Sequence, residues 1–432
     1  MNEFLNLFSK QSEYYSTFFS FSNEYNRCIY NTFVKAWHAF LKNPSSDPKI
    51  AQEKLRHTFD LALAENLKEP AFSKLLSNFI NADTSIAESL KANYAYKAFA
   101  DRYALFDKMT EPVHNIVNRT PSETIKMDGE FDLLHYKSKS VKFKTPLLVV
   151  GSIINREYIL DMLPQVSVIK HFVDMGFDVY STDWKTPSSI SEKMELEDFC
   201  HQFLEMAIDK IKKITGVQNI SLLGYCWGGI FSLIHASIHP ENVKNLILHA
   251  TPIDLKNDTS VVGIWTKNID VGKLVQAFGS IPPTYLNFAF FLRNPVDALS
   301  RYAKFFSQPR NIDEINQFFA IEFWLYDSPP IVGKVFEQII NDIYKNNLLI
   351  QNKMKVGKDR TDLSKITMPV LNIIGEKDDL VPPQTSRTIL EKIPSKDAKE
   401  IAFPTGHVGL CISKHAHEKL WPQVSSWLAQ RS

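Results

Sequence analysis

Ser221–Ile230, with the sequence SLLGYCWGGI, decides the fold of this chain. The pattern predicts a strand, a tight turn and the start of a helix. Gly224-x-Cys226-x-Gly228 has the spacing of a nucleophile elbow, with cysteine where serine is usual. The glycines let strand and helix approach closely, and the turn lifts the thiol above the sheet. The alternative is a buried structural cysteine in an ordinary strand-to-helix turn.

The composition is that of a large globular protein. The 432 residues are 44% hydrophobic, which suffices for one large core and a smaller accessory region. The formal charge of +1 indicates no nucleic-acid partner. The four cysteines form neither a zinc motif nor a disulfide framework. Residues 1–10 do not resemble a signal peptide, and no apolar run is long enough for a transmembrane helix. We therefore expect a soluble, cytoplasmic protein.

Two regions differ in pattern. Residues 1–110 predict an N-terminal helical region with aromatic stripes, more typical of packing than of docking. Residues 111–432 predict an α/β domain, because short apolar runs alternate with helical segments, as in a mostly parallel sheet covered on both faces. We expect strands at residues 147–150, 178–182, 219–223, 245–249, 369–374 and 399–403.

A long interval separates the fourth of these strands from the fifth. Residues 254–364 are aromatic and largely helical in pattern, and far exceed an ordinary connection. An insertion here would lie over the carboxyl ends of the strands, where ligands bind in open α/β sheets. We interpret it as a cap.

A thiol nucleophile needs a base and a group that orients the base. His407 follows the sixth strand, where the α/β-hydrolase order places the histidine. The acid should follow the fifth strand, where Glu376, Asp378 and Asp379 compete. Backbone amides of Trp227 and of Ile154, in the loop after the first strand, are candidate oxyanion donors.

Other candidate sites are weaker. His235 and His239 stand four apart on the helix after the elbow, a spacing that a metal tolerates, but no third ligand is apparent from the sequence. We therefore predict no metal. The basic run from Lys353 to Arg360 is typical of a solvated face, although it could meet a phosphate-bearing substrate. Cys411 lacks an elbow and is expected to pack in the core.

From about His114 to the C-terminus the sequence resembles the poly(3-hydroxyalkanoate) synthases, most closely the shorter class III and IV enzymes. The resemblance rests on motifs in family order, namely Asn155–Asp161, Gly176–Tyr180, Asp183-Trp184, the elbow, Trp324–Pro329, Asn347–Leu349, Asp378–Pro383 and Gly406–Gly409. It implies the α/β-hydrolase fold with a helical cap. Asp379 departs from the family, which commonly has histidine there, and the short synthases lack the segment before His114.

The resemblance implies that Cys226 is the nucleophile, His407 the base and Asp378 the acid of acyl transfer from (R)-3-hydroxyacyl-coenzyme A. The product would be a polyester, and no cofactor is required because the substrate arrives activated. The family further implies a homodimer, an activating partner subunit and a location at the surface of polyester granules. The alternatives are a cysteine hydrolase of the dienelactone hydrolase or thioesterase type, and a non-catalytic granule-associated protein.

Overall fold

The computed structural model describes residues 119–188, 191–283, 285–287, 290 and 312–432. The chain divides into two units, and apart from the first part of one helix everything reported below belongs to the unit made of Val117–Pro283 and Ala320–Ser432. The expected N-terminal helical region, residues 1–110, lies outside the described residues. Among the described helices, none is both long and apolar enough to cross a membrane.

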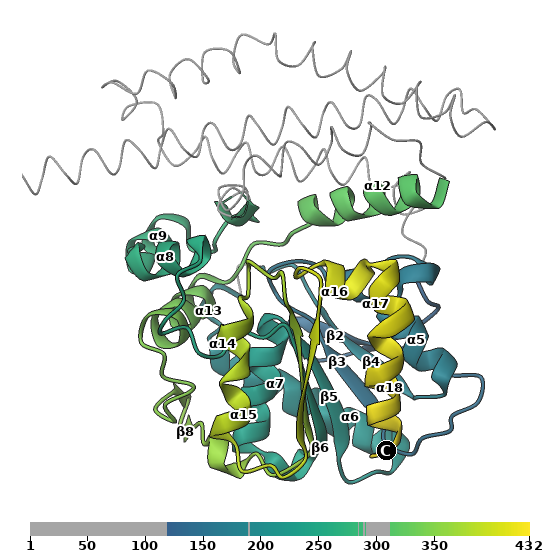
Figure 1. Ribbon diagram of the computed structural model, residues 1–432. Coiled ribbons are helices and arrows are strands. Elements are labelled where there is room, and N and C mark those ends of the chain that lie inside the picture. Colours follow the sequence, from purple (N-terminus) through teal and green to yellow (C-terminus); the bar gives the residue numbers. More distant parts are fainter. Residues whose placement is uncertain (1–118, 189–190, 284, 288–289, 291–311) are drawn as a thin grey trace, which may run out of the picture. The chain divides into compact units, whose positions relative to one another are not determined.

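The apolar runs of the α/β region form the expected parallel strands (Figure 1). Their ends differ from the predicted ends by a residue or two at most, because each run is bounded by a turn residue or a polar residue. All but the last of them are buried along most of their length, as expected for a sheet covered on both faces. The last, at the end of the sheet order, has only Ile401 and Phe403 buried. They are β3 (Leu147–Val150), β4 (Val179–Trp184), β5 (Ile220–Tyr225), β6 (Val243–His249), β9 (Val370–Gly375) and β10 (Ala398–Phe403).

Two further strands precede them. β1 (Glu123–Lys126) and β2 (Phe131–Tyr136) pair antiparallel, and β2 pairs antiparallel with β4, which completes an eight-stranded sheet of order β1-β2-β4-β3-β5-β6-β9-β10. Neither strand is predicted by the sequence pattern. β1 is mostly exposed and polar, and β2 interrupts its apolar residues with Asp132 and His135. Both polar side chains are buried and form hydrogen bonds, with Lys126 and Asp178 respectively. The strand therefore depends on tertiary contacts more than on its own apolar pattern.

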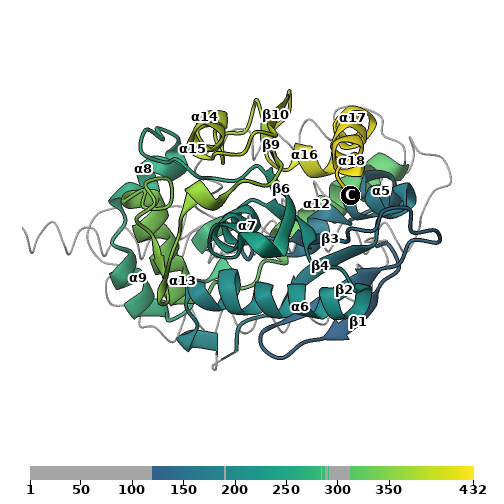
Figure 2. The same ribbon diagram turned by 90° about the horizontal axis from the view of Figure 1, so that it is seen from below.

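Helices cover both faces of the sheet, which confirms the predicted fold class. α6 (Leu204–Thr215) and α7 (Trp227–Ile238) lie on one face, and α5 (Val168–Met175) and α18 (Trp421–Ala429) on the other (Figure 2). Local sequence sets the ends of α5. Ser167 caps its first turn by accepting from the amide of Lys170, and Gly176 ends it at φ 99°, a conformation that favours glycine.

The long interval between β6 and β9 is mainly helical in its described part. It contains α8 (Val261–Asn268), α9 (Val271–Phe278), α12 (Ile312–Tyr326), α13 (Gly333–Gln338), the π-helical η6 (Ile339–Lys345), the hairpin β7 (Lys355–Val356) and β8 (Asp359–Arg360), and η7 (Leu363–Lys365). Of α12, residues 320–326 belong to the unit described here. Residues 284, 288–289 and 291–311 of the expected cap are outside the described residues.

Short helices fill the remaining connections. Before the elbow these are η1 (Glu157–Leu160), η2 (Pro164–Val166), η3 (Ser191–Lys193) and the π-helical η4 (Asp198–Phe203). After it come η5 (Pro240–Asn242), α14 (Pro383–Arg387), α15 (Ile389–Lys392), α16 (Gly409–Ile412) and α17 (Lys414–Lys419).

The close approach of α7 to the sheet depends on glycine. A Cβ atom on Gly228 would lie 2.1 Å from the carbonyl oxygen of Val150 in β3, and one on Gly229 would lie 1.9 Å from Oγ1 of Thr251. Both distances are far inside van der Waals contact. The first partner is a backbone atom of the central sheet, which cannot rotate away.

We predict that Gly228→Ala lowers the free energy of unfolding by about 3 kcal/mol or more, because helix and strand must separate to admit a methyl group. Gly216→Ala is the matched control, since a Cβ there meets nothing within 4 Å and only its φ of +75° is strained. That control should cost about 1–2 kcal/mol. Urea unfolding followed by circular dichroism measures both. Equal costs for the two variants would contradict a steric role for Gly228.

Candidate active site

Cys226 lies at the turn between β5 and α7 in a strained backbone conformation. Its φ is 54° and its ψ is −120°, outside the regions that residues with a side chain normally occupy. Such strain costs on the order of 1–3 kcal/mol and persists only where its surroundings hold it. The amide of Cys226 donates to the carbonyl of His249 at 2.9 Å, and its carbonyl accepts from Gly229 at 3.0 Å. These bonds hold the turn from both sides.

His407 and Asp378 are joined by a hydrogen bond near this turn. Nδ1 of His407 lies 2.7 Å from Oδ2 of Asp378, and both side chains are buried. The other oxygen of Asp378, Oδ1, accepts from the amides of Leu380 at 3.0 Å and Val381 at 2.8 Å. The carboxylate is therefore fixed by its own loop and presents one oxygen to the imidazole.

The structure separates the carboxylates that sequence reasoning left open. Asp378 follows β9 and turns inward to His407, whereas Glu376 and Asp379 are exposed. The separation follows from the turn after β9, in which the side chain of Asp378 accepts from amides two and three residues further on.

The charges around His407 favour the imidazolium. Burial lowers the pKa of His407, but the carboxylate of Asp378 and the side chain of Cys226, each also hydrogen-bonded to the ring, raise it to about 10. One imidazole thus contacts both the sulfur and the carboxylate. This arrangement can stabilise a thiolate and can move a proton to or from a group bound at Cys226.

Two further rings line this cluster. Tyr225 lies with its ring centroid 5.1 Å from that of His407 and 4.8 Å from that of His249. Burial, together with the neighbouring charge of His407, lowers the pKa of His249 to about 3, so this second histidine is uncharged. The sequence pattern assigned neither residue to the site, because a histidine at the end of a strand carries no distinctive spacing.

The two candidate oxyanion donors differ. The amide of Trp227 belongs to the first turn of α7, where backbone N–H groups have no partner within the helix. The amide of Ile154 donates to Oγ of Ser152 at 3.2 Å, within the loop after β3. Ile154 could bind an oxyanion only by giving up that bond, so of the two Trp227 is the better placed.

Residues of the insertion reach the elbow. The indole Nε1 of Trp227 donates to the hydroxyl of Tyr344, in η6, at 3.1 Å, and Phe336 of α13 lies with its ring 6.2 Å from that of Trp227. Burial and the nearby Cys226 raise the pKa of Tyr344. Nothing in the sequence spacing singled out Tyr344, because it lies more than a hundred residues from the cysteine it approaches.

A second set of hydrogen bonds ties the insertion to the loop after β3. The indole Nε1 of Trp324 donates to the carbonyl of Arg156 at 2.8 Å, and the hydroxyl of Tyr158 donates to Oδ2 of Asp327 at 2.9 Å. The sequence places the two segments in the loop after the first strand and in the cap, and nothing in it predicts that they meet. In the structure these hydrogen bonds join the insertion to the loop that contains Ile154.

The remaining candidates lie away from this cluster or serve the core. Cys411, on α16, is fully buried beside Tyr225. His235 is fully buried within α7, whereas His239, just beyond the helix, approaches His201 instead. The basic run forms the exposed β7–β8 hairpin, in which Lys355 and Arg360 are exposed.

Comparisons with known proteins identify the family to which the chain is similar. Residues 147–411 match the model of the alpha/beta hydrolase fold, and residues 88–172 match that of the poly-beta-hydroxybutyrate polymerase (PhaC) N-terminus. The poly(3-hydroxyalkanoate) polymerase subunit PhaC of Haloferax mediterranei is 35% identical over 77% of this chain and 68% of its own. Those of Allochromatium vinosum (35% identical, 66% of this chain and 81% of its own) and Thiocystis violacea (32%, 75% and 94%) are similar.

We predict that the imidazolium of His407 persists well above the ordinary histidine pKa of about 6.5, and that Asp378→Asn and Cys226→Ala each shift its titration to lower pH. Each variant removes one of the two groups that raise the pKa, so at pH 8 the wild-type ring should carry more charge than either variant. NMR of protein labelled at histidine measures this, with the signal assigned through His407→Gln. An unchanged midpoint in both variants would contradict the coupling.

Proposed function

The chain belongs to the poly(3-hydroxyalkanoate) polymerase family within the α/β-hydrolase superfamily, and from that premise we propose that Cys226 carries the growing ester chain. The protein is an acyltransferase, and we propose that it polymerises (R)-3-hydroxyacyl-coenzyme A into poly(3-hydroxyalkanoate). The observation that carries the proposal is the imidazole of His407, held between Asp378 and the side chain of Cys226.

In the first half of the reaction, the thiolate of Cys226 attacks the thioester carbonyl of the substrate. The negative charge that forms on the carbonyl oxygen is stabilised by the amide of Trp227, at the N-terminus of α7. The bond between the carbonyl carbon and the sulfur of coenzyme A then breaks. The leaving thiolate takes the proton of the His407 imidazolium, and an acyl-enzyme remains.

In the second half, His407 acts as a base. Its ring accepts the proton of the hydroxyl of another hydroxyacyl unit, and that oxygen attacks the acyl carbon bound to Cys226. An ester bond forms, and the thiolate of Cys226 leaves beside the newly protonated imidazole. Asp378 holds the ring through Nδ1 in both halves, so that the other ring nitrogen faces the reacting atoms.

The hydroxyl must outcompete water, which would release a free acid instead. Tyr344 and Phe336 of the insertion pack on Trp227 beside the nucleophile, and both are buried. These buried rings support a polymerase over a hydrolase of the same fold, because exclusion of water from the acyl-enzyme favours attack by the hydroxyl of a second substrate. An activating subunit, a homodimer and binding at a polyester granule belong to the same proposal as properties to be measured on the full chain.

We predict that purified protein releases coenzyme A from 3-hydroxybutyryl-coenzyme A and forms insoluble polyester, seen as turbidity. Cys226→Ala should abolish both signals, because no covalent carrier remains. Cys411→Ala is the matched control and should keep activity within a few-fold. Release of coenzyme A without polymer would overturn the polymerase in favour of a thioesterase. Activity that survives Cys226→Ala would overturn the nucleophile.

We predict that Asp378→Asn lowers the rate of coenzyme A release by about 10³–10⁴-fold, because the neutral amide no longer stabilises the imidazolium or fixes its tautomer. Asp379→Asn should stay within a few-fold of the wild type, since this neighbouring side chain is exposed. Steady-state rates of the two variants, measured side by side, decide between the two residues. A large loss in Asp379→Asn with Asp378→Asn nearly unchanged would reverse the assignment.

A further inference from the structure

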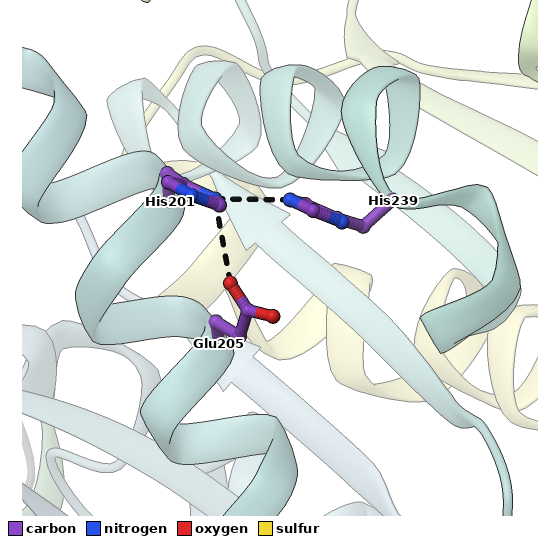
Figure 3. A group of neighbouring side chains, drawn as sticks. All are labelled: His201, Glu205 and His239. Atoms are coloured by element: carbon purple, nitrogen blue, oxygen red, sulfur yellow. Dashed lines mark hydrogen bonds and ion pairs between the residues drawn. The ribbon is translucent and has the colours of Figure 1, made fainter. Parts of the chain in front are cut away.

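A second cluster of metal-ligating side chains lies outside the acyl-transfer site. His201, Glu205 and His239 each offer one ligand atom, and these atoms all lie within 4.8 Å of one another (Figure 3). Nε2 of His239 is 3.0 Å from Nδ1 of His201, which in turn is 3.5 Å from Oε2 of Glu205. The three residues come from two helical segments distant in sequence. We propose that they bind a divalent first-row transition metal ion.

The backbone explains how the three side chains meet. His201 and Glu205 are four residues apart on the continuous helical run of η4 and α6, so both project from one face. His201 belongs to the π-helical turn, a distortion that is frequent at functional sites. His239 follows the last turn of α7, and Pro240 disfavours continuation of that helix.

The donor set favours zinc or a related ion over calcium or magnesium. Two imidazole nitrogens and one carboxylate oxygen suit first-row transition metals, whereas calcium and magnesium take oxygen ligands. Three protein ligands leave room for a water molecule in a tetrahedral site. The side chains of His201 and His239 are 17% and 22% exposed, so an ion can enter from solvent.

A carboxylate behind the site supports the same reading. Nδ1 of His239, the nitrogen that faces away from His201, lies 3.4 Å from Oε1 of Glu241. Histidines that bind a metal commonly donate their other N–H to a carboxylate, which fixes the tautomer and makes the ligating nitrogen more basic. Glu241 is thus a positioning residue for His239.

The two imidazoles now face each other as hydrogen-bond partners. Their rings are nearly parallel, at 4°, and one of the two facing nitrogens must carry the proton between them. A metal ion takes the place of that proton, and both nitrogens then act as lone-pair donors. The ligands need to move apart only slightly, because nitrogens on a tetrahedral zinc at about 2.0–2.1 Å lie a little more than 3 Å from one another.

This site is independent of the proposed acyl transfer. Cys226 precedes α7 and His239 follows it, and the 12 residues of that helix span about 18 Å. An ion there cannot touch the reacting atoms. It would join the far end of α7 to η4 and α6, and so would stabilise the packing of these helices against unfolding.

The test is a titration of chelator-treated full-length protein with zinc chloride, followed by isothermal titration calorimetry. We expect one site that is weakened at least about tenfold in His239→Ala and in Glu205→Gln, and less strongly in Glu241→Gln. His415→Ala, which removes an exposed histidine, should bind as the wild type does. Cys226→Ala should also bind normally, which separates this site from the thiol and imidazole of the catalytic cluster.

Two further measurements guard against misfolded variants and misplaced ions. The melting temperature of the wild type should rise with zinc concentration, whereas that of Glu205→Gln, a nearly isosteric change, should rise much less. Cobalt should give the visible spectrum of nitrogen and oxygen coordination without a thiolate charge-transfer band. Absence of zinc binding, equal binding in Glu205→Gln, or loss of the site in Cys226→Ala would each overturn the proposal.

Discussion

The positive φ of Cys226 is the constraint on which the site depends. A φ of 54° is unfavourable for a residue with a side chain. The close-packed junction of β5, β3 and α7 holds Cys226 in this conformation. Gly224, Gly228 and Gly229 each stand where a Cβ would lie 2.5 Å or less from a neighbouring atom. The junction and the strained turn therefore require each other. If strand and helix separate, nothing holds the turn.

The same turn fixes what surrounds the sulfur. Because the chain enters α7 directly after Cys226, the amides of the first turn of that helix lie beside the thiol. The carboxyl ends of the parallel strands β9 and β10 then bring the loops of Asp378 and His407 to the same edge of the sheet. The strand order thus brings together the three proposed catalytic residues, Cys226, His407 and Asp378. The hydrogen bond from Asp378 then fixes the orientation of the imidazole.

The sequence determines some of these features locally and others only through packing. The parallel strands, the elbow and the position of His407 could be predicted because each depends on neighbours along the chain. Which of Asp378 and Asp379 meets His407 could not be told from the residues alone, since both lie in one turn and only the folded loop buries the first and exposes the second. β2 was missed because its Asp132 and His135 find their partners only in the fold. The approach of His239 to His201 depends on how two helices pack, which no spacing in the sequence records.

Water is the competitor that the proposed reaction must exclude, and the structure indicates where this selection would be made. The α/β-hydrolase fold itself does not distinguish water from an alcohol, because nucleophile, base and acid serve either acceptor. Selection of the alcohol over water must therefore depend on residues that the fold does not require. Two such residues lie beside Trp227, and both come from the insertion. Tyr344 places its hydroxyl on the indole of Trp227, and Phe336 covers the adjacent surface. If the chain is a transferase built on a hydrolase fold, the buried rings of Tyr344 and Phe336 are therefore where we expect water to be excluded from the acyl-enzyme.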